Sequence, residues 1–525
     1  MRVWAPNAGA VDLLHDGSRT AMRRVGGGWW AADVDRVARY AFSLDGGPPR
    51  PDPRSRSQPE GPHRPSAVVD LPTPTPTPTP WAGRSLDGAV VYELHVGTFS
   101  EEGTFAGVAE HLDHLVDVGV THVELMPVAE FPGRWGWGYD GVDLYAPHHA
   151  YGGPAGLRTL VDECHRRGLA VLLDVVYNHL GPSGNYLGEF GPYFTDRYGT
   201  PWGWAVNLDG PDSDEVRAFV VDNARMWRQD YGIDGLRLDA VHAIFDFSAA
   251  HVLEELSALG GVIAESDLND PRLVREVAVG GYGLTAQWSD DYHHALHAVL
   301  TGERTGYYGD FGSLAQLAKA LTRGFVYDGG YQPSRRRRHG RPLPPDVPAH
   351  RLLAYAQTHD QVGNRAQGER LSMLVDDGRL RIAAALTLLS PFTPMLFQSE
   401  EWGSATPFQY FTDHDDPDLG RAVSEGRRRE FAAFGWAPED VPDPQDPATF
   451  ERSKLDWAEV AKSPHAELLN WHRELIALRR QHRLHEGGFE SVDVRYDEDE
   501  GWFVMDRGSV RAECNLRDST VRVLG

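Results

Sequence analysis

Strand-like and helix-like hydrophobic patterns alternate through most of the chain. From about residue 85, eight short apolar runs follow one another, and most are separated by segments with apolar positions at helical spacing. The runs that predict strands are residues 90–99, 122–128, 169–177, 235–241, 261–266, 284–289, 352–358 and 394–398. Helices are expected around residues 105–118, 157–167, 214–231 and 248–259. Such βα units predict an α/β fold, a (β/α)8 TIM barrel with enlarged loops.

An open, doubly wound sheet is the structural alternative to this barrel. Sheets of that kind that bind dinucleotides carry a Gly-rich phosphate-binding turn after the first strand. No such turn follows residues 90–99. The barrel is therefore the better prediction.

The two ends of the chain carry a different pattern. Short apolar runs broken by Gly and Pro near the start predict a small β-sandwich; they are residues 2–4, 11–14, 29–34 and 40–44. A Pro-Thr repeat over residues 71–80 cannot form a helix and predicts an extended linker. We expect residues 1–80 to form this sandwich and linker.

The barrel is expected to extend over residues 81–485. A helical pattern over residues 466–478 would complete its outer ring of helices. The last part, residues 486–525, has strand-like runs at 503–506 and 521–524. It predicts a short C-terminal β-domain, and the about 35 residues from Ser491 onward would leave that domain incomplete.

The charge balance excludes some classes of partner. The 525 residues include 51 Lys and Arg against 76 Asp and Glu, a net charge of −25. Such an acidic protein is a poor match for nucleic acid or an anionic membrane, so we expect neither as a partner. Its cysteines, Cys164 and Cys514, cannot form a disulfide scaffold and are too few for a cysteine-built zinc site.

Neither export nor membrane insertion is predicted. No run approaches the ~20 apolar residues that span a bilayer. The first residues, Met1 to Pro6, lack the apolar core of a signal peptide. We therefore expect a soluble protein of the cytoplasm.

Polar side chains gather where four of the predicted strands end. In a barrel of this kind, the carboxyl ends of the strands meet at one mouth, where active sites lie. The clusters are Asp174, Asn178 and His179; Arg237, Asp239 and His242; Glu265 and Ser266; and Thr358, His359, Asp360 and Gln361. A single Asp or His at a strand end is usually a helix cap or a solvated loop residue. Four clusters on one barrel predict an active site.

Strand periodicity gives two of these residues a shared face. Arg237 and Asp239 are two positions apart, so they point the same way, and the guanidinium would keep the Asp239 carboxylate ionised. Glu265 ends the next strand, and Asp360 supplies a third carboxylate. Paired carboxylates cleave glycosides, because one can attack the sugar carbon while the other protonates the leaving oxygen.

The segments around these residues resemble the four signature segments of the α-amylase family (glycoside hydrolase family 13). They are Asp174-Val-Val-Tyr-Asn178-His179, Gly235-Leu-Arg237-Leu-Asp239, Ala264-Glu265-Ser266 and His359-Asp360. The resemblance implies that Asp239 is the nucleophile, Glu265 the general acid/base and Asp360 the carboxylate that stabilises the transition state. It also implies that Tyr139 stacks on the sugar being cleaved, and that its other neighbours are His179, Arg237 and His359.

Further segments narrow the resemblance within that family. Residues 91–99, 264–271, 287–294, 301–308, 359–365 and 441–447 resemble the members that cleave the α-1,4 bond next to the terminal trehalose unit of maltooligosyltrehalose. The implied substrate-binding residues, besides those already named, are Leu238, Ala240, Val241, His242, Asp290, Asp291, Tyr292, His293, His294, Gln361, Val362, Gly363 and Asn364. The resemblance implies maltooligosyltrehalose and related α-glucans as substrates, no cofactor, and functional pairing with a maltooligosyltrehalose synthase.

Two other functions stay open at this stage. The same chemistry with a sugar as acceptor would make a glucan-branching or other transglycosylating enzyme. An inert barrel could instead serve for binding or as a transporter subunit, but such relatives lose the three carboxylates or carry a membrane span. This sequence has the three carboxylates and no apolar run of membrane-spanning length.

A metal site is not predicted. A calcium site of the kind seen in some amylases needs oxygen ligands from several loops, and no compact loop of that kind is visible near His148-His149. The basic run Arg335–Arg338 is interpreted as a solvated loop. Ser399 stands where the family usually has Gly, just before Glu400-Glu401.

Overall fold

A closed barrel of eight parallel strands forms the centre of the protein. The computed structural model describes residues 1–35, 37–71, 81–432 and 436–525. The barrel order is β12-β15-β16-β17-β20-β21-β8-β9. The strands are β8 (Val91–Leu94), β9 (His122–Leu125), β12 (Ala170–Val175), β15 (Gly235–Leu238), β16 (Val262–Ala264), β17 (Ala286–Trp288), β20 (Leu352–Ala354) and β21 (Thr393–Phe397). This confirms the predicted fold and excludes the open sheet.

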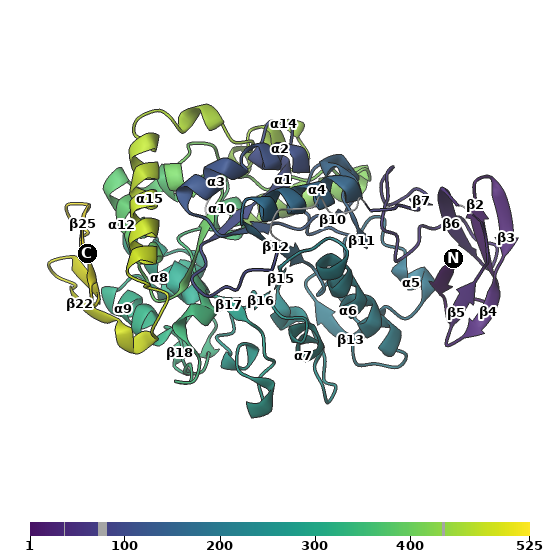
Figure 1. Ribbon diagram of the computed structural model, residues 1–525, viewed down its shortest axis with the longest axis horizontal. Helices are drawn as coiled ribbons and strands as arrows, with labels where there is room; N and C mark the ends of the chain where they lie inside the picture. The colour runs from purple at the N-terminus through teal and green to yellow at the C-terminus, as the bar shows by residue number, and fades with distance from the viewer. Residues whose placement is uncertain (36, 72–80, 433–435) are drawn as a thin grey trace.

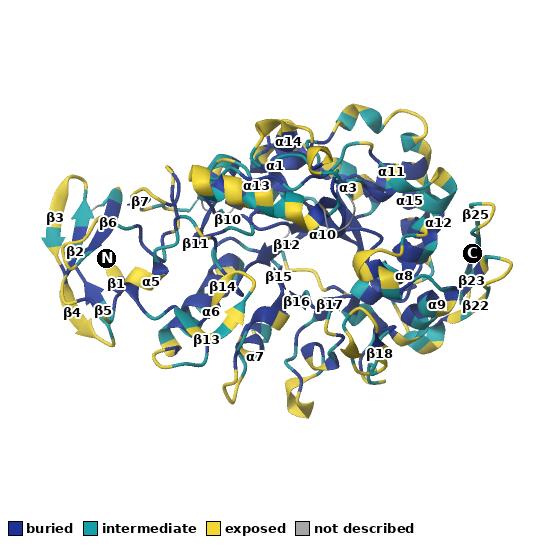
Figure 2. Cartoon of the chain, turned by 180° about the vertical axis from the view of Figure 1, so that it is seen from behind, coloured by how far each residue is buried: buried dark blue, intermediate teal, exposed yellow. Residues whose placement is uncertain are grey.

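Nearly every barrel residue is buried, because helices cover the outside and side chains fill the inside (Figure 2). An apolar cluster inside the barrel includes Val91, Leu172, Ile263, Trp288, Leu353 and Met395. Polar side chains also point inward from the strands. Asp174 on β12 is in register with Arg237 on β15, and Glu93 on β8 with Glu124 on β9. The strand register therefore places charged groups side by side inside the barrel.

Helices surround the barrel (Figure 1). The main ones are α3 (Leu112–Val118), α4 (Gly153–Arg166), α6 (Asp214–Gln229), α7 (Val252–Ser257), α8 (Asp290–Thr301), α9 (Leu314–Arg323), α12 (Asp377–Leu388) and α15 (His465–Gln481). The helix expected over residues 105–118 is broken at His111 into α2 (Phe105–Glu110) and α3. The His111 ring stacks on Trp457 at 3.8 Å, so a tertiary contact accompanies the break.

Two antiparallel sheets lie at the N-terminal end of the molecule (Figure 1). Their orders are β1-β5-β4 and β3-β2-β6-β7. The strands are β1 (Arg2–Trp4), β2 (Val11–His15), β3 (Ser18–Ala21), β4 (Arg23–Gly26), β5 (Trp29–Ala31), β6 (Arg39–Leu44) and β7 (Ser66–Ala67). The predicted Pro-Thr linker falls, from residue 72 to 80, outside the described residues. The boundaries of the three parts stay predictions.

A four-stranded antiparallel sheet lies at the opposite end (Figure 1). It consists of β22 (Asp493–Asp497), β23 (Trp502–Arg507), β24 (Val510–Asn515) and β25 (Thr520–Leu524), and it packs on α9 and α12. Alternate residues of β23 and β24 are buried, as in a sheet with one solvated face. The four strands of this short C-terminal β region thus form an antiparallel meander.

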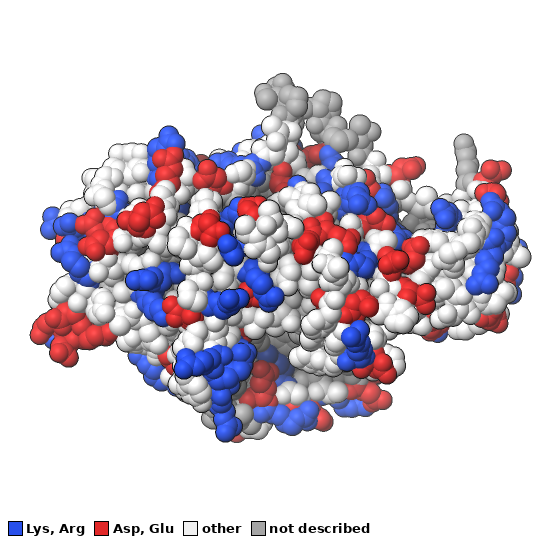
Figure 3. Space-filling view, turned by 90° about the horizontal axis from the view of Figure 1, so that it is seen from below, with Lys and Arg blue, Asp and Glu red and all other residues white. Residues whose placement is uncertain are grey.

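Acidic and basic side chains are interspersed over the face drawn in Figure 3. Within the described residues, every helix is too short or too polar to cross a membrane.

Candidate active site

Arg237 lies at the centre of the polar groups that the strand ends bring together. Its side chain is 1% exposed. Nη1 lies 2.8 Å from Oδ2 of Asp174 and 3.0 Å from Oδ1 of Asp239, and Nη2 lies 3.1 Å from Oε2 of Glu265. The guanidinium also lies over the Trp288 ring, 4.2 Å from its centroid. One buried cation therefore contacts carboxylates from three neighbouring strands.

Asp239 follows β15 and is held at both carboxylate oxygens. Arg237 binds Oδ1, and the Asn178 side-chain amide donates a hydrogen bond of 2.7 Å to Oδ2. The same amide group donates to the Asp239 carbonyl at 2.9 Å. These contacts fix the orientation of the carboxylate.

Glu265 follows β16 and has a different environment. The backbone N–H of Ala240 donates to its Oε2 at 2.7 Å, and Ala240 adopts a left-handed φ of 38°. Such a φ is costly for a residue with a side chain and is often found at functional sites. Burial raises the pKa of Glu265 well above its usual value; Arg237 opposes this rise, while the charges on Asp239 and other carboxylates add to it.

The charges of two further carboxylates, Asp360 and Asp290, also raise the pKa of Glu265. Asp360 belongs to α10 (His359–Gly363), and its Oδ1 accepts a hydrogen bond of 2.6 Å from the Asn364 amide. Asp290 begins α8 and accepts a hydrogen bond from the Tyr355 hydroxyl. Burial raises the pKa of Asp290 to about 7, and the nearby Asp267 and Asp360 charges contribute.

Tyr139 and His359 form the next layer of contacts. The Tyr139 hydroxyl donates to Asp174 at 2.7 Å and lies 2.9 Å from Nε2 of His359, whose ring it stacks on at 5.2 Å. Glu93 accepts from the His359 backbone N–H at 2.9 Å and binds Nδ1 of its ring. Burial acts to lower the pKa of His359, but the Glu93 carboxylate outweighs it and the pKa is raised. His179 lies beside them, with Nε2 3.0 Å from the Tyr139 carbonyl.

A pocket of about 440 Å³ opens above these groups. Of the residues expected at the site, those that line it are His242, Glu265, Asp290, Asp291, His294, Asp360 and Gln361. Asp239, Tyr139, His179 and His359 are not among the described lining residues. These residues belong to the group of contacts around Arg237, and Arg237 contacts the pocket residue Glu265 directly. Gly363 and Asn364 adjoin Asp360, and Arg427 donates to both.

Four side chains expected to bind substrate are buried and do not line this pocket. Leu238 alternates with Arg237 along β15, so it faces the surrounding helices and is fully buried. Tyr292 lies 3.1 Å from the Thr387 hydroxyl. The His293 ring nitrogens contact the Ala356 carbonyl and the Tyr308 hydroxyl, each at 2.9 Å. Val362 packs in an apolar cluster with Trp137.

Ala240 and Val241 reach Glu265 only through their backbone. The Ala240 N–H donates to its carboxylate, and the Val241 N–H donates to its carbonyl at 3.1 Å. Their buried side chains do not line the pocket.

A hairpin that was expected to be a solvated loop forms one wall of the pocket. It consists of β18 (Tyr331–Gln332) and β19 (Arg337–Arg338). Arg336, Arg337 and Arg338 are exposed, as predicted, but Arg335 pairs with Asp267 and lines the pocket with Gln332 and Ser334. Asp267 makes a second contact at the end of the hairpin: its carbonyl lies 2.8 Å from Nε2 of His339, the residue that follows β19.

Sequence reasoning missed two carboxylates of the site. Asp267 stands in the segment 264–271, two residues after Glu265, which was a usable signal. Glu93 is an acidic residue inside an apolar strand run, and such a residue is seldom buried without a partner.

One group of side chains among the described residues is close enough to hold a metal ion. It consists of Glu130, His148 and His149, whose ligand atoms lie within 4.8 Å of one another, and it does not line this pocket.

Comparisons with known proteins agree with this architecture. The family model of the alpha-amylase catalytic domain matches residues 81–196. The chain is 52% identical to the malto-oligosyltrehalose trehalohydrolase of Arthrobacter ramosus, over 99% of this chain and 93% of the relative. It is 46% identical to the enzyme of that name from Saccharolobus solfataricus, over 92% and 85%.

A solved structure extends the likeness to three dimensions. A Salmonella typhimurium protein, 39% identical over 98% of this chain and 90% of its own, superposes with a TM-score of 0.90. Identity at these levels over nearly the whole chain is far above what a shared barrel alone produces. The protein therefore belongs to the malto-oligosyltrehalose trehalohydrolase family of glycoside hydrolases, built on an alpha-amylase catalytic domain.

Proposed function

We propose that the protein hydrolyses the α-1,4 bond next to the terminal trehalose unit of maltooligosyltrehalose and releases trehalose. The observation that carries this proposal is the contact of one buried guanidinium, Arg237, with both Asp239 and Glu265 at the mouth of the barrel. Two carboxylates so joined are close together, as a retaining glycosidase requires. Family membership directs the choice of substrate.

The reaction takes two steps. Asp239 attacks the anomeric carbon while the bond to the leaving oxygen breaks, and Glu265 gives its proton to that oxygen, so trehalose departs. Glu265 then takes a proton from water, the water oxygen attacks the same carbon, and the bond to Asp239 breaks. Both contacts that Glu265 receives from the described residues use Oε2, so Oε1 is the oxygen that carries the proton into the pocket.

The pocket walls would bind the sugars around this bond. Asp360 accepts a hydrogen bond from Asn364 and lines the pocket. Its carboxylate can therefore accept hydrogen bonds from sugar hydroxyl groups and stabilise the positive charge of the transition state. His242, Asp290, His294 and Gln361 offer further polar contacts. Tyr139, whose hydroxyl contacts Asp174 and His359, would stack on the sugar being cleaved, as in the family that the sequence resembles.

The decisive experiment is product analysis on maltooligosyltrehalose and on a plain maltooligosaccharide of equal length. Trehalose should be the main product from the first, and release of glucose or maltose from the second should be much slower. Asp239→Asn and Glu265→Gln should each reduce trehalose release by at least about 100-fold, because general acid–base catalysis alone contributes ~10²–10⁴-fold. Glu110→Gln, an exposed change on α2, is the control. Retention of more than about a hundredth of the rate in either variant would reject the assignment.

Glucan branching is the second candidate, because it uses the same covalent intermediate. Incubation with amylose distinguishes the two: branching lowers iodine staining without releasing trehalose or reducing ends. An inert binding barrel would release no product from either substrate.

The protein is expected to act in the cytoplasm beside the enzyme that makes its substrate. A chain with a terminal α,α-1,1-linked unit must come from an enzyme that rearranges the reducing end of a maltooligosaccharide, which is the reaction class of a maltooligosyltrehalose synthase. Cell fractionation tests the location. Gel filtration of the protein mixed with such a synthase tests physical association, and separate elution would reject it.

A further inference from the structure

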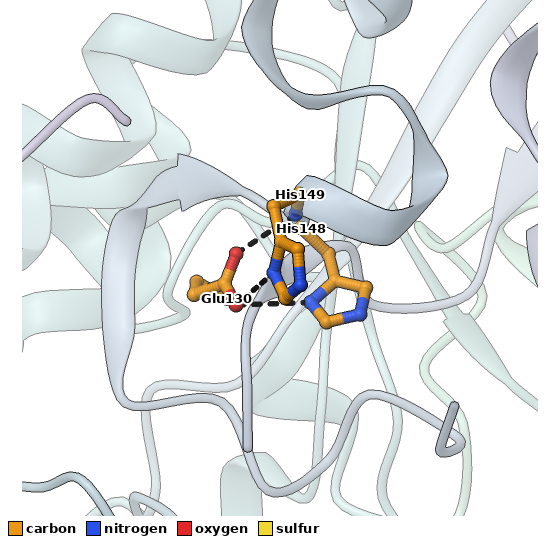
Figure 4. A group of neighbouring side chains, drawn as sticks. All are labelled: Glu130, His148 and His149. Atoms are coloured by element: carbon orange, nitrogen blue, oxygen red, sulfur yellow. Dashed lines mark hydrogen bonds and ion pairs between the residues drawn. The ribbon is translucent and has the colours of Figure 1, made fainter. Parts of the chain in front are cut away.

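Glu130, His148 and His149 form a compact group (Figure 4), and none of them lines the active-site pocket. Glu130 ends β10 (Ala129–Glu130), His148 directly follows β11 (Asp143–Pro147), and His149 begins the 3-10 turn η1 (His149–Tyr151). The antiparallel pairing of β10 with β11 brings the carboxylate to both imidazoles.

The three side chains converge on one point. Nδ1 of His149 lies 2.7 Å from Oε1 of Glu130, and Nδ1 of His148 lies 3.2 Å from the same oxygen. The backbone N–H of His149 donates to Oε2 at 2.8 Å, which fixes the plane of the carboxylate. The side chains of Glu130 and His148 are 0% exposed.

His148 has a nitrogen without a hydrogen-bond partner. Among the described residues, no group forms a hydrogen bond with its Nδ1, although Oε1 of Glu130 is within ion-pair distance. The other nitrogen, Nε2, lies 3.4 Å from the Arg134 carbonyl, an acceptor that favours a proton on Nε2. In that tautomer the lone pair of Nδ1 faces a carboxylate oxygen, and the two acceptors are stabilised by a proton or a metal ion placed between them.

The surroundings fit a cation and hold the ligands in place. Asp143 lies opposite Glu130 in the β10–β11 pair and adds a second buried carboxylate. The Phe131 ring stacks on His148 at 3.8 Å, and the Arg134 carbonyl beside Nε2 is the second contact that metal-binding histidines usually make. His149 is 27% exposed at its side chain and lines an open pocket of about 720 Å³, which gives an ion a way in.

We propose that Glu130, His148 and His149 bind a divalent transition metal ion of the zinc type. Two imidazole nitrogens and one carboxylate oxygen are the donor set that zinc prefers, whereas calcium and magnesium take oxygen ligands. Zinc–ligand distances of about 2.0–2.1 Å place tetrahedral ligand atoms roughly 3.3 Å apart, so the 2.7 Å contact of His149 would open while ligand atoms as far as 4.8 Å apart would draw together. Water from the open pocket would supply the fourth ligand. The sequence predicted no metal here because it does not reveal that Glu130 faces both histidines.

The bound ion would link the strands at the two ends of the segment 131–142, because Glu130 ends β10 and the two histidines follow β11. This segment begins after Glu130, ends before β11, and carries Trp137 and Tyr139 toward His359. The expected consequence of binding is stabilisation of that segment.

The test is direct titration of the full chain after treatment with EDTA and removal of the chelator. Calorimetry with zinc chloride should give one site per chain, and zinc should raise the melting temperature. Cobalt(II) should give the visible absorption of a four-coordinate ion. His149→Gln removes one of the three ligands. It should therefore weaken zinc binding at least about tenfold and abolish the rise in melting temperature that zinc causes. His63→Gln, a histidine that lines the same open pocket but lies outside the group, is the matched control and should bind as the wild type does.

Two results would overturn the proposal. One is the absence of zinc binding by the wild-type chain at micromolar concentrations, which would leave the group as a proton-sharing pair. The other is equal binding by the wild type and His149→Gln, or an equal loss in His63→Gln. Glu130→Gln is a second variant and should also lose binding; if it does not fold, the half-exposed His149 variant decides the question.

Discussion

At the scale of single residues, Ser399 is a side chain in a place that suits glycine. Its φ is 68°, in the left-handed region, and its buried Oγ has no hydrogen-bond partner among the described residues. Its backbone N–H is bound by the Tyr92 hydroxyl at 2.8 Å, so the backbone cannot relax easily. Both the left-handed backbone and the unpaired hydroxyl cost free energy.

Ser399→Gly is therefore expected to raise the free energy of unfolding by about 0.5–1 kcal/mol, the relief of left-handed strain less the greater entropy of unfolded Gly. Urea denaturation measures the change. Ser404→Gly is the control, because the Ser404 hydroxyl donates to Glu459 at 2.7 Å and accepts from the Thr406 N–H at 3.0 Å. Ser404→Gly should be less stable than the wild type. A higher free energy of unfolding in both Ser399→Gly and Ser404→Gly would contradict the explanation.

Asp290 predicts a dependence of stability on pH. Its pKa is about 7 in the folded protein against 3.8 ordinarily, so the folded state binds the proton more tightly than the unfolded state. Stability then falls as the pH rises from about 4 through 7, where the buried carboxylate must ionise. Asp290→Asn removes this loss and should be more stable than the wild type by over about 1 kcal/mol at pH 8. This gain in stability should be smaller at pH 4, and thermal melts of the wild type and Asp290→Asn at pH 4 and pH 8 measure it. An equal difference at both would contradict the prediction.

The residues of the site differ in how far the sequence reveals them. Asp239 and Glu265 were predicted because they end strands and match signature segments, and the structure joins them through Arg237. Tyr292 and His293 stand in a matching segment as well, but helix geometry turns them into the core. A segment match identifies a stretch of chain, whereas the direction of each side chain depends on the element that carries it.

At the scale of elements, α10 depends on a glycine at its end. A Cβ on Gly363 would lie 2.0 Å from Cζ2 of Trp137. The Trp137 ring in turn meets His359 edge-on at 5.5 Å, so its displacement would disturb the start of the same helix, where Asp360 lies.

Gly363→Ala should destabilise the protein by about 1–3 kcal/mol, as overpacking does, and should also lower kcat. Gly426→Ala is the matched control, since no atom lies within 4 Å of its added Cβ on α13 (Pro417–Ala432). It should stabilise by about 0.5–1 kcal/mol, the usual preference of helices for Ala. Denaturation curves and initial rates check both. A neutral Gly363→Ala would show that the Trp137 ring can move freely.

The barrel strands could be located from the sequence because buried parallel strands are short, continuous apolar runs. The β18–β19 hairpin could not, since its run of four arginines has the composition of a solvated loop. Tertiary contacts, such as the ion pair of Arg335 with Asp267, reveal its place at the pocket. Arg335→Gln should therefore raise KM for maltooligosyltrehalose several-fold, while Arg337→Gln, on an exposed strand, should not; steady-state kinetics of both variants test this.

At the scale of the whole molecule, Arg54 joins the N-terminal sheets to the barrel. It donates to the Tyr145 hydroxyl at 2.9 Å and to Asp222 at 3.0 Å, and its guanidinium lies over the rings of Trp29, Tyr145 and Phe219. Trp29 adds a hydrogen bond of 2.9 Å to Glu215.

Arg54→Ala should lower the free energy of unfolding by about 2–3 kcal/mol, because it removes two hydrogen bonds of a partly buried guanidinium and its contacts with three aromatic rings. Arg56→Ala is the matched control: Arg56 pairs with Asp230 at 2.6 Å, but both side chains are about a third or more exposed. Its loss should be below about 1 kcal/mol. Chemical denaturation compares them, and equal losses would show that Arg54 does not secure the sheets.

The contact of Arg237 with both Asp239 and Glu265 has a consequence for the order of proton transfers. In the first step of the proposed reaction, the negative charge on Asp239 helps to keep Glu265 protonated. Once Asp239 is esterified to the sugar, that charge is gone and the guanidinium acts on Glu265 without it. The pKa of Glu265 must then fall in the covalent intermediate, the state in which it has to accept a proton from water. The chemistry of one carboxylate thus resets the acidity of the other between the two halves of each turnover.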